Sequence, residues 1–154
     1  MPICNLYDMI NAISLGQKLL GLDVGKKTIG LALADPQSKV ASPQPVLWRK
    51  KFTTDATLLI EQIVELNIGG LVLGWPLNMD GTAGPRCDSV RDFAHAFLRL
   101  HEIPISFQDE RLSTQAVERE MIAADMTRAK RAIRRDSLAA VWILQSALDA
   151  YHHQ

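Results

Sequence analysis

The sequence predicts an α/β fold: a mixed five-stranded sheet, with three antiparallel strands followed by two parallel ones, and helices on both faces. Two apolar segments, 18–24 and 28–34, are separated only by Gly25-Lys26-Lys27, which indicates a hairpin of buried strands. Later, short apolar segments alternate with segments of helical periodicity, the order typical of parallel crossover connections. The length of 154 residues predicts one domain with a full core, and no internal repeat is visible.

The first half of the chain carries the three antiparallel strands. Residues 1–17 form a leader with a helical turn or two, and the single domain is predicted to cover 18–154. The strand over 18–24 is apolar almost throughout, as in a central strand covered on both faces. The strand over 28–34 alternates large residues with Gly and Ala, which leaves room for a helix or a ligand. The third strand, over 39–47, contains two prolines, which favour the edge of the sheet.

The second half alternates between helical and extended patterns. Thr53, Thr54 and Asp55 offer N-cap oxygens to its first helix. The predicted elements are, in order, a helix through Ala56–Leu66, a strand over 69–74, a helix with Pro85 in its first turn, a strand over 103–107, and a helical tail whose last helix is opened by Asp136.

Composition predicts an ordinary globular protein of the cytoplasm. No run of 18 apolar residues occurs, so no transmembrane helix and no membrane partner are expected, and the N-terminus does not resemble a secretory signal. Cys4 and Cys87 are expected to be free thiols. The 17 basic and 17 acidic residues balance, which argues against a strongly basic nucleic-acid coat.

Three acids are predicted to follow strands or open a helix: Asp23, Glu110 and Asp136. Asp23 interrupts an apolar strand near its end, where an unpaired charge would cost several kcal/mol. Ligands of α/β sheets gather at such strand ends, and carboxylates brought together there repel one another unless a cation relieves them. Mg²⁺ or Mn²⁺ is the expected cofactor, since hard cations prefer oxygen ligands and serve phosphodiester cleavage.

Two of these acids also have structural interpretations. Asp136, followed by Ser137, would make a good N-cap. Glu110 could pair with its neighbour Arg111 on the surface, and Asp109 could be the functional acid in its place. Asp23 is the hardest of the three to explain structurally.

Several basic residues are candidates for binding phosphates. Lys26 follows Asp23 in the same turn, and Arg86 lies near a helix N-terminus after a loop rich in turn-forming residues. The segment 111–135 holds seven basic and three acidic residues, and it would either grip a polyanion or form a solvated helical face. The predicted nucleic-acid-binding residues are Lys26, Arg86, Arg111, Arg128, Lys130 and Arg131. Trp75 is interpreted as core, with base stacking as the alternative.

Four segments, in this order, carry a resemblance to a known family. They are Leu22-Asp23-Val24-Gly25 with Ile29-Gly30, GWPLNMDG at 74–81 with Gly84-Pro85-Arg86, DERLST at 109–114, and DSLAAVWILQ at 136–145. Together they resemble the motifs of the YqgF family of RNase H-like nucleases, also described as Holliday junction resolvases or pre-16S rRNA nucleases. The resemblance covers about residues 18–151.

The resemblance implies an RNase H-like fold and a metal-dependent endonuclease. It places the catalytic and metal-binding acids at Asp23, Glu110 and Asp136. It further implies 5′-end processing of the small-subunit (16S) rRNA precursor, with precursor rRNA or branched DNA as partner. A homodimer and a ribosomal particle are further candidate partners.

Two other functions stay open from the sequence. One is a Holliday junction resolvase, and the other is a non-catalytic RNA-binding factor of ribosome assembly. An ATPase-type domain of the same core fold is disfavoured, because 154 residues leave no room for its second lobe.

Overall fold

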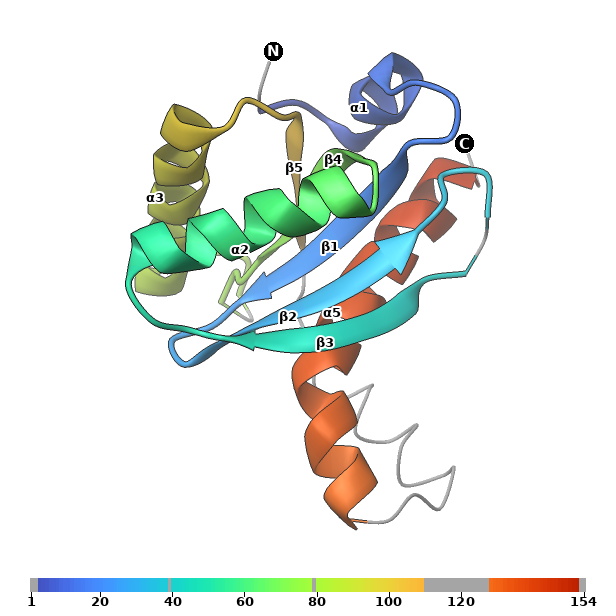
Figure 1. Cartoon of the computed structure of the whole chain (residues 1–154). Coiled ribbons are helices and arrows are strands. Elements are labelled where there is room, and N and C mark those ends of the chain that lie inside the picture. Colours follow the sequence, from blue (N-terminus) through green and yellow to red (C-terminus); the bar gives the residue numbers. More distant parts are fainter. Residues whose placement is uncertain (1–2, 39, 79, 110–127, 153–154) are drawn as a thin grey trace.

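The computed structural model describes residues 3–38, 40–78, 80–109 and 128–152, and within 128–136 it describes the helix backbone alone. The described residues form a five-stranded sheet in the order β3-β2-β1-β4-β5 (Figure 1). β2 pairs antiparallel with β1 and β3, whereas β4 pairs parallel with β1 and β5. The mixed sheet predicted from sequence is therefore confirmed. Its strands are β1 (Lys18–Val24), β2 (Thr28–Ala34), β3 (Ser42–Trp48), β4 (Ile68–Trp75) and β5 (Ile105–Asp109).

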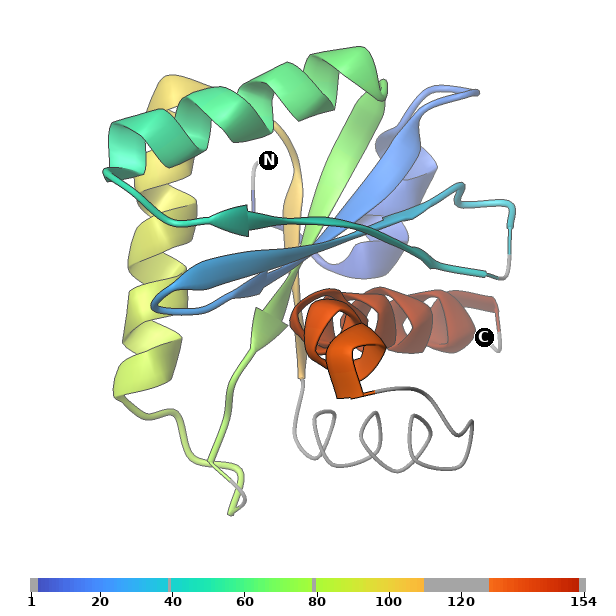
Figure 2. The same ribbon diagram turned by 60° about the horizontal axis from the view of Figure 1, so that its bottom comes forward.

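Helices cover both faces of this sheet, as expected. α2 and α5 lie on opposite sides of it (Figure 2). α3 shares a hydrophobic core with α2, and α1 shares a second one with α5. No helix in the described part of the chain is long and apolar enough to cross a membrane. The helices are α1 (Leu6–Ala12), α2 (Phe52–Glu65), α3 (Pro85–Leu100) and α5 (Arg128–His152).

The central strand β1 contributes to both cores because successive side chains of a strand point to opposite faces. Leu20 and Leu22 are fully buried in the core shared with α2 and α3. Leu19 is fully buried in the core shared with α1 and α5. Gly21 and Asp23 share the face of Leu19, so Asp23 lies on the α5 side of the sheet.

Gly21 allows α5 to approach the sheet closely. A Cβ atom at this position would lie 2.9 Å from Leu144 Cβ and 3.2 Å from the carbonyl oxygen of Ala140. Ala32 and Ala34 of β2 pack in the same core, so the small face predicted for this strand does receive a helix. The contact fixes the level at which α5 crosses β1.

The N-terminal segment packs against the domain that follows it. Met9 is fully buried, and its Sδ atom would lie only 2.6 Å from a Cβ atom at Gly70 of β4. The backbone N–H of Cys4 donates to the carbonyl oxygen of Ile105, 2.9 Å away, alongside β5. Burial, and to a lesser degree Asp8, raise the pKa of the Cys4 thiol, so it stays protonated near neutral pH. Cys4 and Cys87 are both free, as predicted.

β3 occupies an edge of the sheet, as its prolines predicted. It begins at Ser42, later than the predicted start at residue 39. Its end leads directly into the segment that fixes the turn between β1 and β2. There, the N–H of Arg49 donates to the carbonyl oxygen of Lys27 at 2.9 Å, and its Nη1 donates to the carbonyl oxygen of Gly25 at 2.9 Å.

The Arg49 side chain is held in place by a buried acid. Asp55 has no exposed surface, and one of its carboxylate oxygens lies 3.5 Å from Arg49 Nε. Its other oxygen accepts the N–H of Lys50 at 2.9 Å. The expectation that Thr53, Thr54 or Asp55 would provide the N-cap of α2 was wrong, because the helix begins at Phe52 and Lys51 caps it without a side-chain bond. Asp55 instead accepts hydrogen bonds from Arg49 and Lys50, which precede the helix.

Replacing Gly21 with Ala is expected to destabilise the fold. Gly→Ala changes at unstrained positions usually stabilise, by up to about 1 kcal/mol, so the sign of the effect tests the contact. Here the added methyl would overlap Leu144 and the α5 backbone, and overpacking of this kind costs about 1–3 kcal/mol. Urea unfolding of Gly21→Ala measures the change, and an increase in stability would contradict the close approach of α5.

Removing the Asp55 carboxylate should cost far more than removing an exposed one. Asp55→Ala leaves Arg49 Nε and the N–H of Lys50 without their acceptor, and we expect a loss of about 2 kcal/mol. Asp88→Ala is the matched control, because Asp88 pairs with Arg91 at 2.6 Å but both side chains are more than half exposed. Its effect should stay below about 0.5 kcal/mol. Equal losses of thermal stability in the two variants would contradict a special role for burial.

Candidate active site

Asp23 is half-buried at the carboxyl end of β1, on the α5 face of the sheet. Directly across from it on β2 is Gly30. On the other side, β4 is in register with β1 through the Leu22–Leu73 pair, so the next residue of β4, Gly74, is level with Asp23. Both flanking positions lack a side chain on this face. The acid thus lies between two glycines, at a place where a core strand would ordinarily carry an aliphatic residue.

The carboxyl ends of the three parallel strands meet at this edge of the sheet. β4 ends at Trp75 and β5 ends at Asp109, which are register partners. β5 lies two strands from β1, or about 10 Å in the direction of the backbone hydrogen bonds. Asp109 shares the face of Ile105 and Phe107, which pack in the α2–α3 core. Asp109, the alternative to Glu110, is thus on the opposite face from Asp23.

Two of the three predicted acids cannot be compared with Asp23 in full. Glu110 and Arg111 lie outside the described residues. Asp136 lies in α5, about one turn before Ala140, whose carbonyl oxygen borders Gly21. Its side chain, like those of Arg128, Lys130 and Arg131 in the same helix, is outside the description. Their predicted roles remain predictions.

The N-cap interpretation of Asp136 was wrong. α5 begins at Arg128, so Asp136 is inside the helix, about two turns from its start. The segment before Asp136 is rich in Ala, Lys and Arg, which are good helix formers, and contains no Gly or Pro. Ser137 is buried, and its hydroxyl donates to the carbonyl oxygen of Gln44 at 2.7 Å, fastening this part of α5 to β3.

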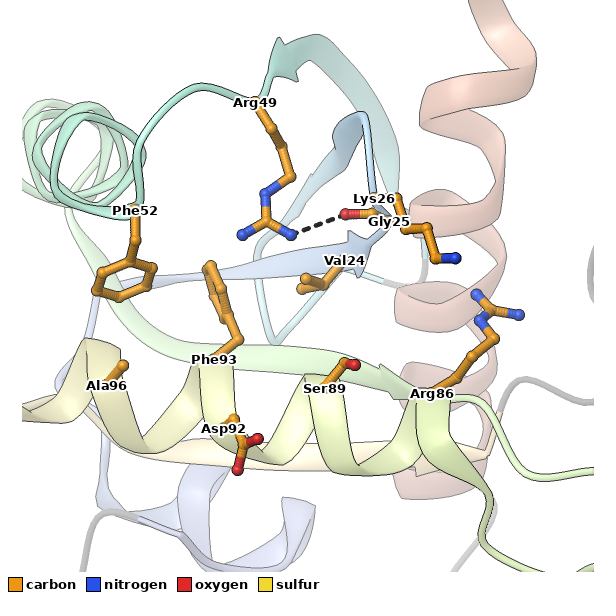
Figure 3. Close-up of a pocket in the computed structure, with 10 residues that line it drawn as sticks. All are labelled: Val24, Gly25, Lys26, Arg49, Phe52, Arg86, Ser89, Asp92, Phe93 and Ala96. Carbon is orange, nitrogen blue, oxygen red and sulfur yellow. Dashed lines mark hydrogen bonds between the residues drawn. The ribbon is translucent and has the colours of Figure 1, made fainter.

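A basic pocket of about 670 Å³ opens on the other side of the same edge. Its walls come from the end of β1 and the turn after it, from the segment between β3 and α2 with the start of α2, and from α3 (Figure 3). Three cations line it: Lys26, Arg49 and Arg86. The sequence had predicted Lys26 and Arg86 as phosphate-binding residues, and the structure brings them to one pocket.

Arg49 was missed by the sequence analysis. Its guanidinium lies 5.6 Å from the centre of the Phe93 ring and a quarter of its side chain is exposed. The available signal was Asp55, an acid one turn before Leu59 on the apolar face of a helix, where a buried charge requires a partner. Nothing in the sequence alone identified Arg49 as that partner.

The loop before α3 is held largely by its own hydrogen bonds. The N–H of Asn78 donates to the carbonyl oxygen of Thr82 at 2.9 Å, and Thr82 donates both its N–H and its hydroxyl to the Asp80 carboxylate. Gly81 takes a positive φ of 89°, as expected for a tight turn. Trp75 packs against Phe107 with ring centres 4.9 Å apart, which confirms that it belongs to the core.

Comparison with known proteins relates the chain as a whole to proteins named as nucleases and resolvases. Residues 17–150 match the family described as RuvX: Holliday junction resolvase. A protein of Paramagnetospirillum magneticum, with the provisional name pre-16S rRNA nuclease, is 50% identical, covering 97% of this chain and 96% of its own. A Brucella ovis protein with the same name is 51% identical, covering 99% of this chain and 94% of its own.

Solved structures show the same fold at low identity. The RuvC of T. thermophilus, in complex with a Holliday junction substrate, aligns with a TM-score of 0.55 at 13% identity, covering 90% of this chain and 97% of that one. The fowlpox virus Holliday junction resolvase aligns with a TM-score of 0.55 at 11% identity, covering 87% of this chain and 99% of that one. The family match spans all five strands and includes Asp23 at the carboxyl end of β1, and the chain belongs to the RuvX family.

Proposed function

We propose that the protein is a metal-dependent endonuclease that hydrolyses phosphodiester bonds in structured nucleic acid, with the 5′ end of precursor 16S rRNA as its substrate. The observation that carries this proposal is the position of Asp23, a half-buried carboxylate at the end of a central strand. The relatives that are about 50% identical and named pre-16S rRNA nucleases support the choice of substrate.

The chemistry of Asp23 fits a bound cation, because carboxylate oxygens suit Mg²⁺ or Mn²⁺. The neighbouring positions, Gly30 and Gly74, place no side chain of their own beside it. We propose that Asp23, Glu110 and Asp136 hold the metal, and that the phosphates of the substrate contact Lys26, Arg86 and Arg111. When bound, divalent metal would supply an activated water and would stabilise the leaving oxygen.

The two other acids fit this arrangement by their positions in the chain. Glu110 directly follows Asp109 at the end of β5, and Asp136 belongs to the helix that crosses β1 at Gly21. Within the proposal, Asp23 is the fixed member of the site, because it sits on a strand bonded on both sides. Arg128, Lys130 and Arg131, in the first turns of α5, would hold the flanking backbone.

Holliday junction resolution is the second candidate function, favoured by the description of the matched family. A junction enzyme would act as a homodimer on branched DNA, whereas an rRNA nuclease would act on a ribosomal particle in the cytoplasm. A non-catalytic assembly factor would bind RNA without cleaving it. These three functions differ in product, so cleavage assays can separate them.

Asp23→Asn is expected to abolish cleavage while preserving the fold. Purified protein with Mn²⁺ or Mg²⁺ is incubated with a 5′-extended precursor rRNA, and cleavage should fall by at least about a hundredfold in the variant. Thermal stability without metal should be unchanged or higher, because repulsion between carboxylates is relieved. Asp109→Asn is the matched control, since it removes an acid at the same edge but on the other face.

The same assay decides among the three functions. A four-way DNA junction is tested beside the precursor rRNA, and EDTA should stop all cleavage. Preferential cleavage of the rRNA supports the proposal, and preferential cleavage of the junction supports resolution. Tight binding without cleavage of either would contradict an enzyme, and full activity of Asp23→Asn would contradict the assigned site.

A further inference from the structure

We infer that the basic pocket between the β1–β2 turn and α3 binds one nucleotide of the substrate strand, on the face of the sheet opposite to Asp23. This inference rests on the proposed function for the identity of the strand, but not for the pocket itself. The pocket would be a binding subsite in addition to the proposed acidic site at Asp23. It would also give a role to Arg49 and to the aromatic side chains beside it.

The pocket has an apolar end and a basic end. Phe52 and Ala96 lie at one end, Lys26 and Arg86 at the other, and Arg49 and Phe93 between them (Figure 3). A nucleotide has the same division, with a flat base at one end and a charged phosphate at the other. The volume of about 670 Å³ lies in the ordinary range of small-ligand pockets, roughly 300–1,000 Å³.

The charge of the pocket favours an anion. Its lining carries three cations and one carboxylate, that of Asp92. Lys26 and Arg86 are exposed, and neither has an ion pair among the described residues. Arg49 is fixed by Gly25 and Asp55, so it offers its remaining N–H groups without losing further conformational entropy. One fixed cation and two exposed ones together suit a phosphate whose position must be defined.

The apolar end suits a base. The Phe52 and Phe93 rings meet edge to face, 5.6 Å apart. Phe52 is only partly buried, and the small side chain of Ala96 on α3 leaves space beside its ring in the pocket. Stacking of bases on aromatic side chains tolerates any sequence, as an enzyme that recognises structure requires.

Three residues of the pocket lining directly follow Asp23 in the chain. They are Val24, Gly25 and Lys26. Asp23 faces α5 and Val24 faces the α2–α3 core, because β1 alternates. A strand cleaved at Asp23 therefore needs only to pass over the end of β1 to place a neighbouring nucleotide in the pocket.

The test measures binding of a short fluorescein-labelled single-stranded oligoribonucleotide by anisotropy, in EDTA so that no cleavage occurs. Arg86→Ala should weaken binding roughly tenfold and reduce the slope of log K against log salt by about 0.7. Ala96→Leu should also weaken binding, because it fills the apolar end. Asp92→Asn should strengthen it by removing a like charge.

Two control variants lie on the same helix and outside the pocket. Arg99→Ala removes an exposed cation, and His95→Leu adds an exposed Leu, and both should bind as the unaltered protein does. Thermal unfolding of each variant checks that it folds. If Ala96→Leu does not fold, the affinity of Arg86→Ala alone tests whether the pocket binds the strand. Unchanged affinity in Arg86→Ala, or an equal loss in Arg99→Ala, would overturn the inference.

Calorimetry with a nucleoside 5′-monophosphate identifies the source of the nucleotide. Binding that Arg86→Ala and Ala96→Leu both weaken supports the pocket as a nucleotide site that also takes the free compound. Absence of heat, together with weakened strand binding in both variants, supports a subsite for the strand alone. The nuclease proposal is judged separately, because an unaltered protein that binds but never cleaves would overturn that proposal and leave the pocket standing.

Discussion

The structure depends on the burial of β1 on both faces of the sheet. It also depends on Asp23, which is only half-buried near the end of this strand. Leu19, Leu20 and Leu22 have no exposed surface, so the strand cannot carry a charge along most of its length. Hydrogen bonding to β2 and β4 fixes it on both sides. Asp23 comes where this double cover ends, and its position is therefore set by the most firmly held element of the fold.

The close approach at Gly21 extends this constraint to α5. A larger residue would push the helix away from the sheet, and with it the segment that contains Asp136. The bond from Ser137 to Gln44 fixes the same part of α5 to the edge strand β3. One glycine and one serine thus set the distance between the strand and the helix on which the proposed acidic site depends.

The sequence predicted the elements that periodicity controls and missed the contacts that depend on three-dimensional packing. The mixed sheet of antiparallel and then parallel strands followed from the hairpin at Gly25 and from the later alternation of helix and strand, and it was confirmed. Arg49 and Asp55 were missed as a pair, because their meeting depends on how the chain turns between β3 and α2. The N-cap assigned to Asp136 failed because local capping preference was overridden by a longer stretch of helix formers. Asp23 could be recognised because an acid in an apolar strand breaks a local pattern.

Both edges of the sheet are protected in the described structure. On β3, Pro43 and Pro45 supply no N–H groups to a neighbouring strand. On β5, the N-terminal segment forms a bridge at Ile3 and a hydrogen bond from Cys4, so part of this edge is already occupied. Association by extending the sheet from one molecule into the next is thereby disfavoured.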